Sequence, residues 1–282
     1  MLGTTVSSRS LLLVDDDDGA HEALTRALQR DNIRIERYAD GSEALARLRT
    51  AECEVVVAGP GRNGVGGLEL LRRARAVRAN LKVIVTGEAD AGRVADAIRA
   101  RAYSYFHKPA AEAALADMVR RAMESDGWKD DIRPISLRPE WVTLSVRCRI
   151  EAAERTTQFL RELFAAAPPP AREDSAMAFR ELLLNGIEHG GQYNPKKRVR
   201  VSMLRTARAL VVHIHDPGHG FSTDVLPHAA ISNPDGEPTR HVEIRAASGQ
   251  RPGGFGILMS RSLVDELLYN ERGNAVVFLK YI

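Results

Sequence analysis

The sequence predicts two domains: an α/β domain with a doubly wound parallel sheet, followed by an α+β sandwich. Three observations support this prediction. The 282 residues suit two domains of ordinary size. Short apolar runs alternate with helical patterns from residue 10 to residue 123, and strands that alternate with helices form parallel sheets. A stretch with mixed charge, glycine and proline, residues 125–137, then reads as a linker to a different arrangement of elements.

The N-terminal elements alternate regularly. Residues 11–14 and 55–58 are wholly apolar, as expected of buried parallel strands. The other strands are expected at residues 33–38, 82–86 and 103–106. Helical patterns cover residues 21–29, 42–49, 68–79, 91–100 and 112–123. A doubly wound sheet follows from this order, and its functional site is expected at the carboxyl ends of the strands.

The C-terminal elements follow a different order, over residues 138–282. Strands are expected at residues 141–149, 198–204, 210–215 and 275–282. Helices are expected at residues 151–164, 176–188 and 257–268, and three prolines at 168–170 are expected to interrupt the chain. Residues 224–250 are polar and irregular, which is typical of a lid or binding segment. This order predicts a sheet with helices on one face.

Composition narrows the class of protein. Apolar residues make up 44% of the chain and charged residues 27%, so both halves can bury a core. No apolar run reaches the roughly 18 residues of a membrane-spanning helix, and the first ten residues lack the apolar stretch of a signal peptide. Cys53 and Cys148 fall in different halves and are expected to be core thiols. The expected location is the cytoplasm, without a membrane partner.

The charge balance disfavours a nucleic-acid partner. The chain has 40 Lys and Arg against 37 Asp and Glu, for a net charge of only +3. Basic runs such as residues 196–198 are short and have no interleaved aromatic residues, so we expect solvated faces. No helix-turn-helix pattern is visible, which disfavours an ordinary transcription-factor output.

Acidic, hydroxyl and amine side chains follow three of the N-terminal strands. Residues 15–18 are four aspartates directly after the first strand, and alone they favour a solvated acidic turn. Thr86 and Lys108 follow the fourth and fifth strands. Together these side chains form a set that can bind Mg²⁺ and a phosphoryl group.

Residues 9–123 therefore resemble the receiver domain of two-component response regulators, which has a flavodoxin-like (βα)5 fold. The resemblance implies that Asp15 and Asp16 form the acidic metal pair, that Thr86 and Lys108 contact the phosphoryl group, and that Tyr105 is the aromatic switch residue. The run Gly-Leu-Glu-Leu-Leu at residues 67–71 aligns the third strand and places the phosphoacceptor at Gly59.

The acceptor position thus lacks a nucleophile. Glycine has no carboxylate, so no acyl phosphate can form there, and a metal ligand is lost as well, which leaves at most weak Mg²⁺ binding. We predict a pseudo-receiver that is not phosphorylated by the usual route. A misalignment, or an unorthodox acceptor such as Asp17, stays open.

Three motifs in the C-terminal half predict a nucleotide site. Glu181 and Asn185 lie four residues apart on one helical face, which alone would indicate only an exposed polar stripe. Asp216, Gly218 and Gly220 follow an apolar strand, where a tight turn is the plainer reading. Gly253, Gly254 and Gly256 open a helix, and backbone N–H groups there suit phosphate. The order and spacing of all three motifs are specific.

Residues 138–282 resemble the GHKL ATPases, and among them the anti-sigma-factor serine/threonine kinases. The resemblance implies that Asn185 ligates Mg²⁺, that Glu181 activates the attacking hydroxyl, and that Asp216 accepts a hydrogen bond from the adenine amino group. It also implies that Gly218 and Gly220 admit the base. Gly253, Gly254 and Gly256 would then lie at the phosphates of ATP.

These resemblances imply a cytoplasmic serine/threonine kinase that acts on an anti-anti-sigma antagonist protein, with a sigma factor as a further partner. A non-catalytic ATP-binding scaffold is the alternative. A degenerate histidine kinase is a third reading, although residues 124–150 contain no histidine to phosphorylate. We expect the receiver-like part to act by constitutive contact, either by forming a homodimer or by resting against residues 224–250.

Overall fold

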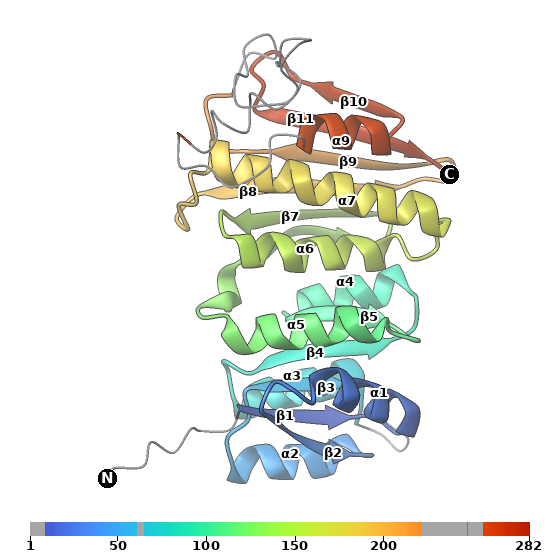
Figure 1. The fold of residues 1–282 in the computed structure, drawn as a ribbon, viewed down its shortest axis with the longest axis vertical. Helices are drawn as coiled ribbons and strands as arrows, with labels where there is room; N and C mark the ends of the chain where they lie inside the picture. The colour runs from blue at the N-terminus through green and yellow to red at the C-terminus, as the bar shows by residue number, and fades with distance from the viewer. Residues whose placement is uncertain (1–8, 61–64, 221–246, 248–255) are drawn as a thin grey trace. The chain divides into compact units, whose positions relative to one another are not determined.

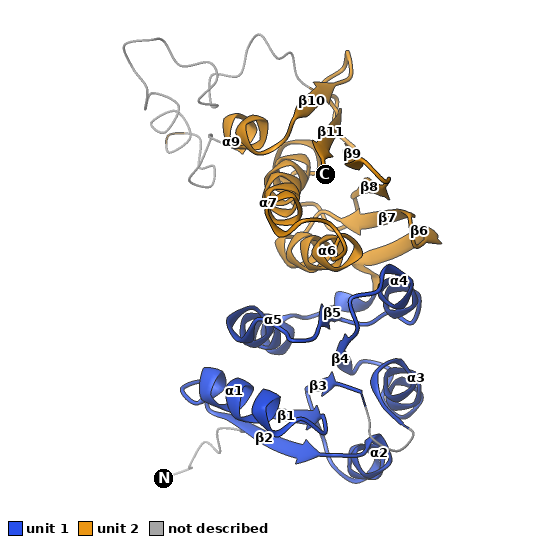
Figure 2. Ribbon diagram, turned by 90° about the vertical axis from the view of Figure 1, so that its right-hand side faces the viewer, with its two compact units in different colours: residues 1–129 blue, residues 130–282 orange. Residues whose placement is uncertain are grey.

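The computed structural model describes residues 9–60, 65–220, 247 and 256–282. The chain divides into two compact units, residues 1–129 and residues 130–282, which Figure 2 shows in different colours. Residues 132–137, which we expected in a linker, belong to a strand of the second unit. The expected linker is therefore too long, because the sheet of the second unit recruits its C-terminal part.

Unit 1 alternates strands and helices as expected (Figure 1). Its strands are β1 (Arg9–Val14), β2 (Ile33–Tyr38), β3 (Val55–Ala58), β4 (Lys82–Gly87) and β5 (Ser104–His107). Its helices are α1 (Asp18–Leu28), α2 (Gly41–Thr50), α3 (Gly67–Val77), α4 (Ala91–Arg99) and α5 (Glu112–Glu124). A short 3-10 turn, η1 (Trp128–Asp130), follows.

The five strands of unit 1 form a parallel sheet in the order β2-β1-β3-β4-β5. Helices α1 and α5 cover one face, and α2, α3 and α4 cover the other (Figure 2). Residues 11–14 of β1 and all of β3 are apolar and buried, and both strands lie inside the sheet, where both faces are covered. This arrangement confirms the predicted flavodoxin-like fold.

The described part of unit 2 consists of an antiparallel sheet and three main helices. Its strands are β6 (Ile132–Arg138), β7 (Trp141–Arg147), β8 (Arg198–Arg205), β9 (Ala209–His215), β10 (Glu266–Tyr269) and β11 (Ala275–Tyr281). Its helices are α6 (Ile150–Leu163), α7 (Pro169–Asn185) and α9 (Gly256–Leu263), and a π-helical turn, η2 (Gly186–Gly190), extends α7.

The sheet of unit 2 has the order β10-β11-β9-β8-β7-β6. Alternate residues of its strands are buried, such as Val142, Leu144 and Val146 on β7. Helices α6, α7 and α9 cover this apolar face (Figure 2). The sheet with helices on one side confirms the predicted α+β sandwich.

Two predicted elements of unit 2 differ from the structure. Pro169 and Pro170 do not interrupt the chain but begin α7, because the first helical positions need no N–H hydrogen bond. The helix expected over residues 257–268 ends at Leu263, and residues 266–269 form β10 instead. Antiparallel pairing of residues 266–269 with β11 overrides the helical pattern of this leucine-containing segment.

Within the residues that the structure describes, no helix combines the length and the apolar character needed to cross a membrane. The lid expected over residues 224–250 lies outside the described residues, except for residue 247.

Candidate functional site

The carboxyl ends of the unit 1 strands bring Asp15, Thr86 and Lys108 to one edge of the sheet. Asp15 follows β1 and is only 2% exposed. Its Oδ1 accepts from the Lys108 ammonium at 2.7 Å and from the Asp17 backbone N–H at 3.0 Å. A buried carboxylate is therefore already neutralised by a cation of the same domain.

Gly59 lies directly beside this carboxylate. A Cβ atom built on Gly59 would stand 2.2 Å from Asp15 Oδ2 and 3.0 Å from the carbonyl oxygen of Val14. Asp15 therefore occupies the space in which an acceptor side chain at position 59 would begin. The absence of a side chain at Gly59 leaves room for the Asp15 carboxylate in the position where Lys108 contacts it.

The Asp15 carboxylate is already engaged by other groups of the domain. One oxygen of Asp15 is held by Lys108 and the Asp17 amide, and the other faces the backbone of Gly59. In the described part of the chain, no group of three or more His, Cys, Asp or Glu side chains could hold a metal ion. The weak metal site expected at Asp15 and Asp16 gains no support from this geometry.

Thr86 and Tyr105 lie in the interior of the domain. Thr86 is 4% exposed, and its hydroxyl has no hydrogen-bond partner among the described residues. Tyr105 is 1% exposed and donates to the carbonyl oxygen of Glu88 at 2.8 Å. Gly87 makes room for this ring, because a Cβ atom there would stand 2.6 Å from the tyrosine oxygen.

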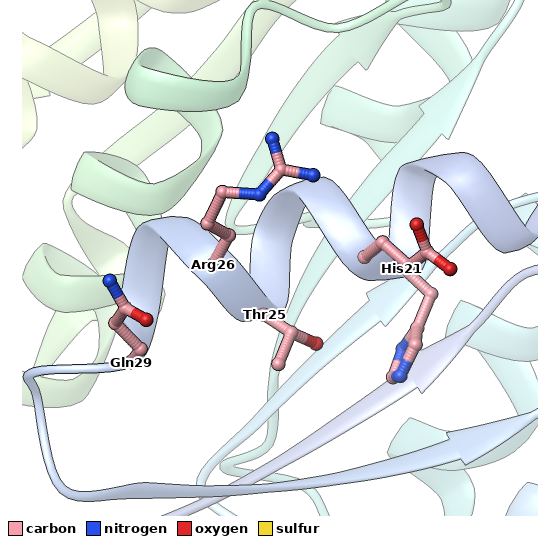
Figure 3. A pocket seen from close by; sticks show the side chains of 5 residues that line it. His21, Thr25, Arg26 and Gln29 are labelled. Atoms are coloured by element: carbon pink, nitrogen blue, oxygen red, sulfur yellow. The ribbon is translucent and has the colours of Figure 1, made fainter.

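A separate hollow of about 370 Å³ lies along α1 (Figure 3). Its lining side chains all belong to this one helix: His21, Glu22, Thr25, Arg26 and Gln29. None of them is a predicted site residue. This hollow therefore does not coincide with the predicted sites, which lie at the sheet edge of unit 1 and in unit 2.

In unit 2, α7 presents Glu181 and Asn185 on one stripe, both half-buried. The first residue of α9 packs directly against them. A Cβ atom built on Gly256 would stand 3.2 Å from Glu181 Oε2 and 3.4 Å from Asn185 Nδ2. The structure therefore brings together two of the three predicted motifs, although they are more than 70 residues apart in the sequence.

Asp216 lies at the end of β9, half-buried. Its Oδ1 accepts from the Gly218 backbone N–H at 2.7 Å. Burial raises the pKa of this carboxyl above its usual range, while the Gly218 N–H and His215 partly counteract that rise. A half-buried carboxylate with one oxygen already used is suited to accept one further hydrogen bond.

The π-helical turn η2 carries two glycines against Asp216. A Cβ atom on Gly190 would stand 2.0 Å from Asp216 Oδ1, and one on Gly186 would stand 3.2 Å from Asp216 Cβ. A Cβ atom on Gly218 would stand 2.7 Å from Gly190 Cα. This close approach of backbone segments requires glycine, and π turns inside helices are frequently found at functional sites.

The β10–β11 connection supports the same loop. Asn274 is buried; its backbone carbonyl accepts from the Asp216 N–H at 3.0 Å, and its side chain donates to the Gly218 carbonyl at 3.3 Å. Gly220 has a φ of +85°, and a Cβ atom there would stand 1.7 Å from the Arg272 carbonyl oxygen. Gly220 is thus required by local packing as well.

These residues fit ATP and Mg²⁺ by the chemistry of their donor and acceptor atoms. Asp216 would accept from the adenine amino group, Asn185 would offer its carboxamide oxygen to the metal, and Glu181 lies beside the start of α9. Gly253 and Gly254, predicted at the phosphates, lie outside the described residues.

The sequence reasoning missed Gly190, Gly186 and Asn274. The glycine pair at residues 190–191, directly after a helical stripe, was the available signal for a close backbone approach. Nothing in the sequence marks Asn274 as a partner of the Asp216 loop, because that contact depends on the hairpin of β10 and β11.

Known protein families match both units of the chain. Residues 11–120 match the family model of the response regulator receiver domain, and residues 146–280 match the histidine kinase-like ATPase domain. The C4-dicarboxylate transport transcriptional regulatory protein DctD of Pseudomonas aeruginosa is 36% identical over 119 residues, 40% of this chain and 25% of that protein. The DctD of Rhizobium meliloti is 33% identical over 116 residues, 41% of this chain and 25% of that protein.

This chain therefore spans only a quarter of the length of these curated relatives. Among solved structures, a response regulator from Thermotoga maritima is 24% identical, with a TM-score of 0.39, over 42% of this chain and 99% of the other. The sheet order of each unit and the two family matches lead to one conclusion: the chain is a signalling protein that joins a response regulator receiver domain to a histidine kinase-like ATPase domain.

Proposed function

We propose that this protein is an ATP-dependent serine/threonine kinase of the anti-sigma-factor type. Its substrate is a small anti-anti-sigma antagonist protein, and a sigma factor is its second partner, so that phosphorylation switches the partner to which the kinase is bound. ATP with Mg²⁺ is the phosphoryl donor. The receiver domain modulates this switch without being phosphorylated.

The observation that carries the proposal is the position of Glu181. Its Oε2 lies 3.2 Å from the Cβ position of Gly256, on the same helical stripe as Asn185. A carboxylate on α7 that lies beside the start of α9 can accept the proton of a substrate hydroxyl, provided that the hydroxyl comes within hydrogen-bond reach. Phosphoryl transfer otherwise depends on positioning and on charge neutralisation by the metal.

The segment that joins α5 to α6 supports this reading over a histidine kinase. Residues 124–150 contain no histidine. Much of this segment forms β6 and β7 of the unit 2 sheet, and no long helical hairpin occurs between α5 and α6. An autophosphorylating histidine kinase needs an acceptor histidine on such a hairpin, so this segment favours transfer to a hydroxyl of another protein.

We propose that the receiver domain acts by contact, as a dimerisation element or as a brake on the ATPase domain. The Asp15–Lys108 ion pair and Gly59 together support a role that needs no acyl phosphate. Such control requires that the receiver domain contacts two states of the kinase differently, because equal contacts shift no equilibrium.

The test is transfer of the labelled γ-phosphate of ATP to candidate antagonist proteins. We expect an acid-stable, base-labile phosphoester on the antagonist, and its loss in the Glu181→Gln variant while calorimetry still detects ATP. An acid-labile product would indicate histidine chemistry. ATP binding without transfer to any antagonist would instead support the scaffold reading and refute the kinase.

A further inference from the structure

Arg180 of α7 connects two carboxylates that belong to different helices. Its Nε lies 3.0 and 3.2 Å from the two carboxylate oxygens of Glu154 on α6, and one terminal nitrogen lies 2.6 Å from Glu154 Oε1. The other terminal nitrogen donates to Glu181 Oε1 at 2.9 Å. All three nitrogens of the guanidinium are used in this group, the Glu154–Arg180–Glu181 cluster.

The cluster is substantially withdrawn from water. The side chains of Glu154 and Glu181 are 13% and 14% exposed, and that of Arg180 is 37% exposed. The hydrogen bonds and charge of Glu154, followed by the charge of Glu181, raise the pKa of the Arg180 guanidinium above its ordinary value. The cluster is thus a charge-assisted network and not a pair of mobile surface charges.

Glu154 orients the guanidinium that contacts Glu181. Side chains at neighbouring helix positions point in different directions, so residues 180 and 181 do not face one another by helix geometry alone. Two-point contact with Glu154 fixes the plane of the guanidinium, because its fork is rigid. The remaining nitrogen is thereby directed at Glu181.

The consequence for Glu181 is a fixed orientation. Arg180 holds Oε1, and Oε2 is then the oxygen that lies 3.2 Å from the Cβ position of Gly256. A carboxylate that rotated freely would present either oxygen to the start of α9, or neither of them. Misplacement of a reacting group by about 1 Å can lower a rate by about 100-fold.

We propose that Arg180, anchored by Glu154, is a positioning residue that turns the Glu181 carboxylate toward the start of α9. The expected effect on kcat rests on the proposed kinase function, whereas the orientation of the Glu181 carboxylate does not. Arg180 itself touches neither substrate nor metal in this assignment.

The kinetic test compares three variants of the full chain. Arg180→Met should lower kcat for phosphoryl transfer about 10- to 100-fold, with KM for ATP and calorimetric ATP affinity unchanged. Glu154→Gln should lower kcat less, because the anchor is weakened while Arg180 remains. Arg161→Met is the matched control, since Arg161 pairs with Glu173 between the same two helices, but Glu173 is 50% exposed. The control should behave as wild type.

Crystal structures of the variants supply a readout that needs no activity. In Arg180→Met, the Glu181 carboxylate should leave its place beside Gly256, whereas it should stay there in Arg161→Met. If no antagonist is phosphorylated even by the wild type, the kinase proposal fails and these structures alone decide on Arg180. An unmoved Glu181 carboxylate in Arg180→Met, or an undiminished kcat, would overturn the inference.

Discussion

Removal of the Lys108 ammonium should destabilise the receiver domain much more than removal of an ordinary surface cation. Asp15 is 2% exposed, and Lys108 approaches it to 2.7 Å with a side chain that is 26% exposed. Breaking a fully buried ion pair by removing one partner costs about 3–5 kcal/mol. Because Lys108 is partly exposed and the Asp17 N–H remains, we expect Lys108→Met to cost about 2–3 kcal/mol.

Hydrogen exchange of the β1 and β3 amides is the suitable assay. It reports the free energy of unfolding of this domain, without requiring the whole two-domain chain to unfold in one step. A loss of 2–3 kcal/mol corresponds to exchange that is about 30- to 150-fold faster. Arg121→Met is the control, because the Arg121–Asp117 pair is 38% and 54% exposed and should contribute at most about 0.5 kcal/mol.

The double variant Asp15→Asn with Lys108→Met separates pairing from simple packing. With the carboxylate gone, the unpaired charge is gone too, so exchange should return toward the wild-type rate. The reasoning is refuted if Lys108→Met exchanges no faster than the Arg121→Met control, or if the double variant is as unstable as the two single changes together.

The remaining predictions concern the acceptor position, the metal and the nucleotide loop. Acetyl phosphate should leave residues 1–129 unmodified by intact mass, and Gly59→Asp should not restore an acyl phosphate, because its Cβ would stand 2.2 Å from Asp15 Oδ2. A hydroxylamine-labile mass gain would contradict this. Without nucleotide, Mg²⁺ should leave amide exchange in the receiver domain unchanged. Gly190→Ala should abolish ATP binding on calorimetry, because the new Cβ would stand 2.0 Å from Asp216 Oδ1, whereas Gly19→Ala, with its closest contact at 3.3 Å, should bind normally. The pKa of Asp216 is raised, so acidification should weaken ATP binding at pH values above those at which an ordinary carboxyl group titrates. The reason is that the protonated carboxyl group has one hydrogen-bond acceptor fewer. Because the pKa of Asp216 is raised in the folded state, the nucleotide-free domain should gain stability as the pH falls through that pKa. Stability and ATP affinity should therefore change in opposite directions. Neither change should occur in Asp216→Asn.

Much of this protein could be derived from local patterns. Wholly apolar runs such as residues 55–58 identify buried parallel strands, because both faces of such a strand are covered. The four-residue spacing of Glu181 and Asn185 puts them on one stripe by helix geometry. The absence of a carboxylate at Gly59 was also readable directly, since the aligned segment contains no nucleophile.

The tertiary structure decided what these residues touch. The sequence could show that position 59 lacks an acceptor, but only the packing shows that Asp15 fills the vacant space and pairs with Lys108. Residues 266–269 became a strand because β11 was available as a partner, which no local pattern reveals. The contact of Glu154 with Arg180 joins residues on two helices, and contacts of this kind leave no periodic trace in a sequence. The hydrophobic period of a helix or strand shows which of its faces is buried. Which residues of two different elements contact one another depends on distances that exist only in the folded chain.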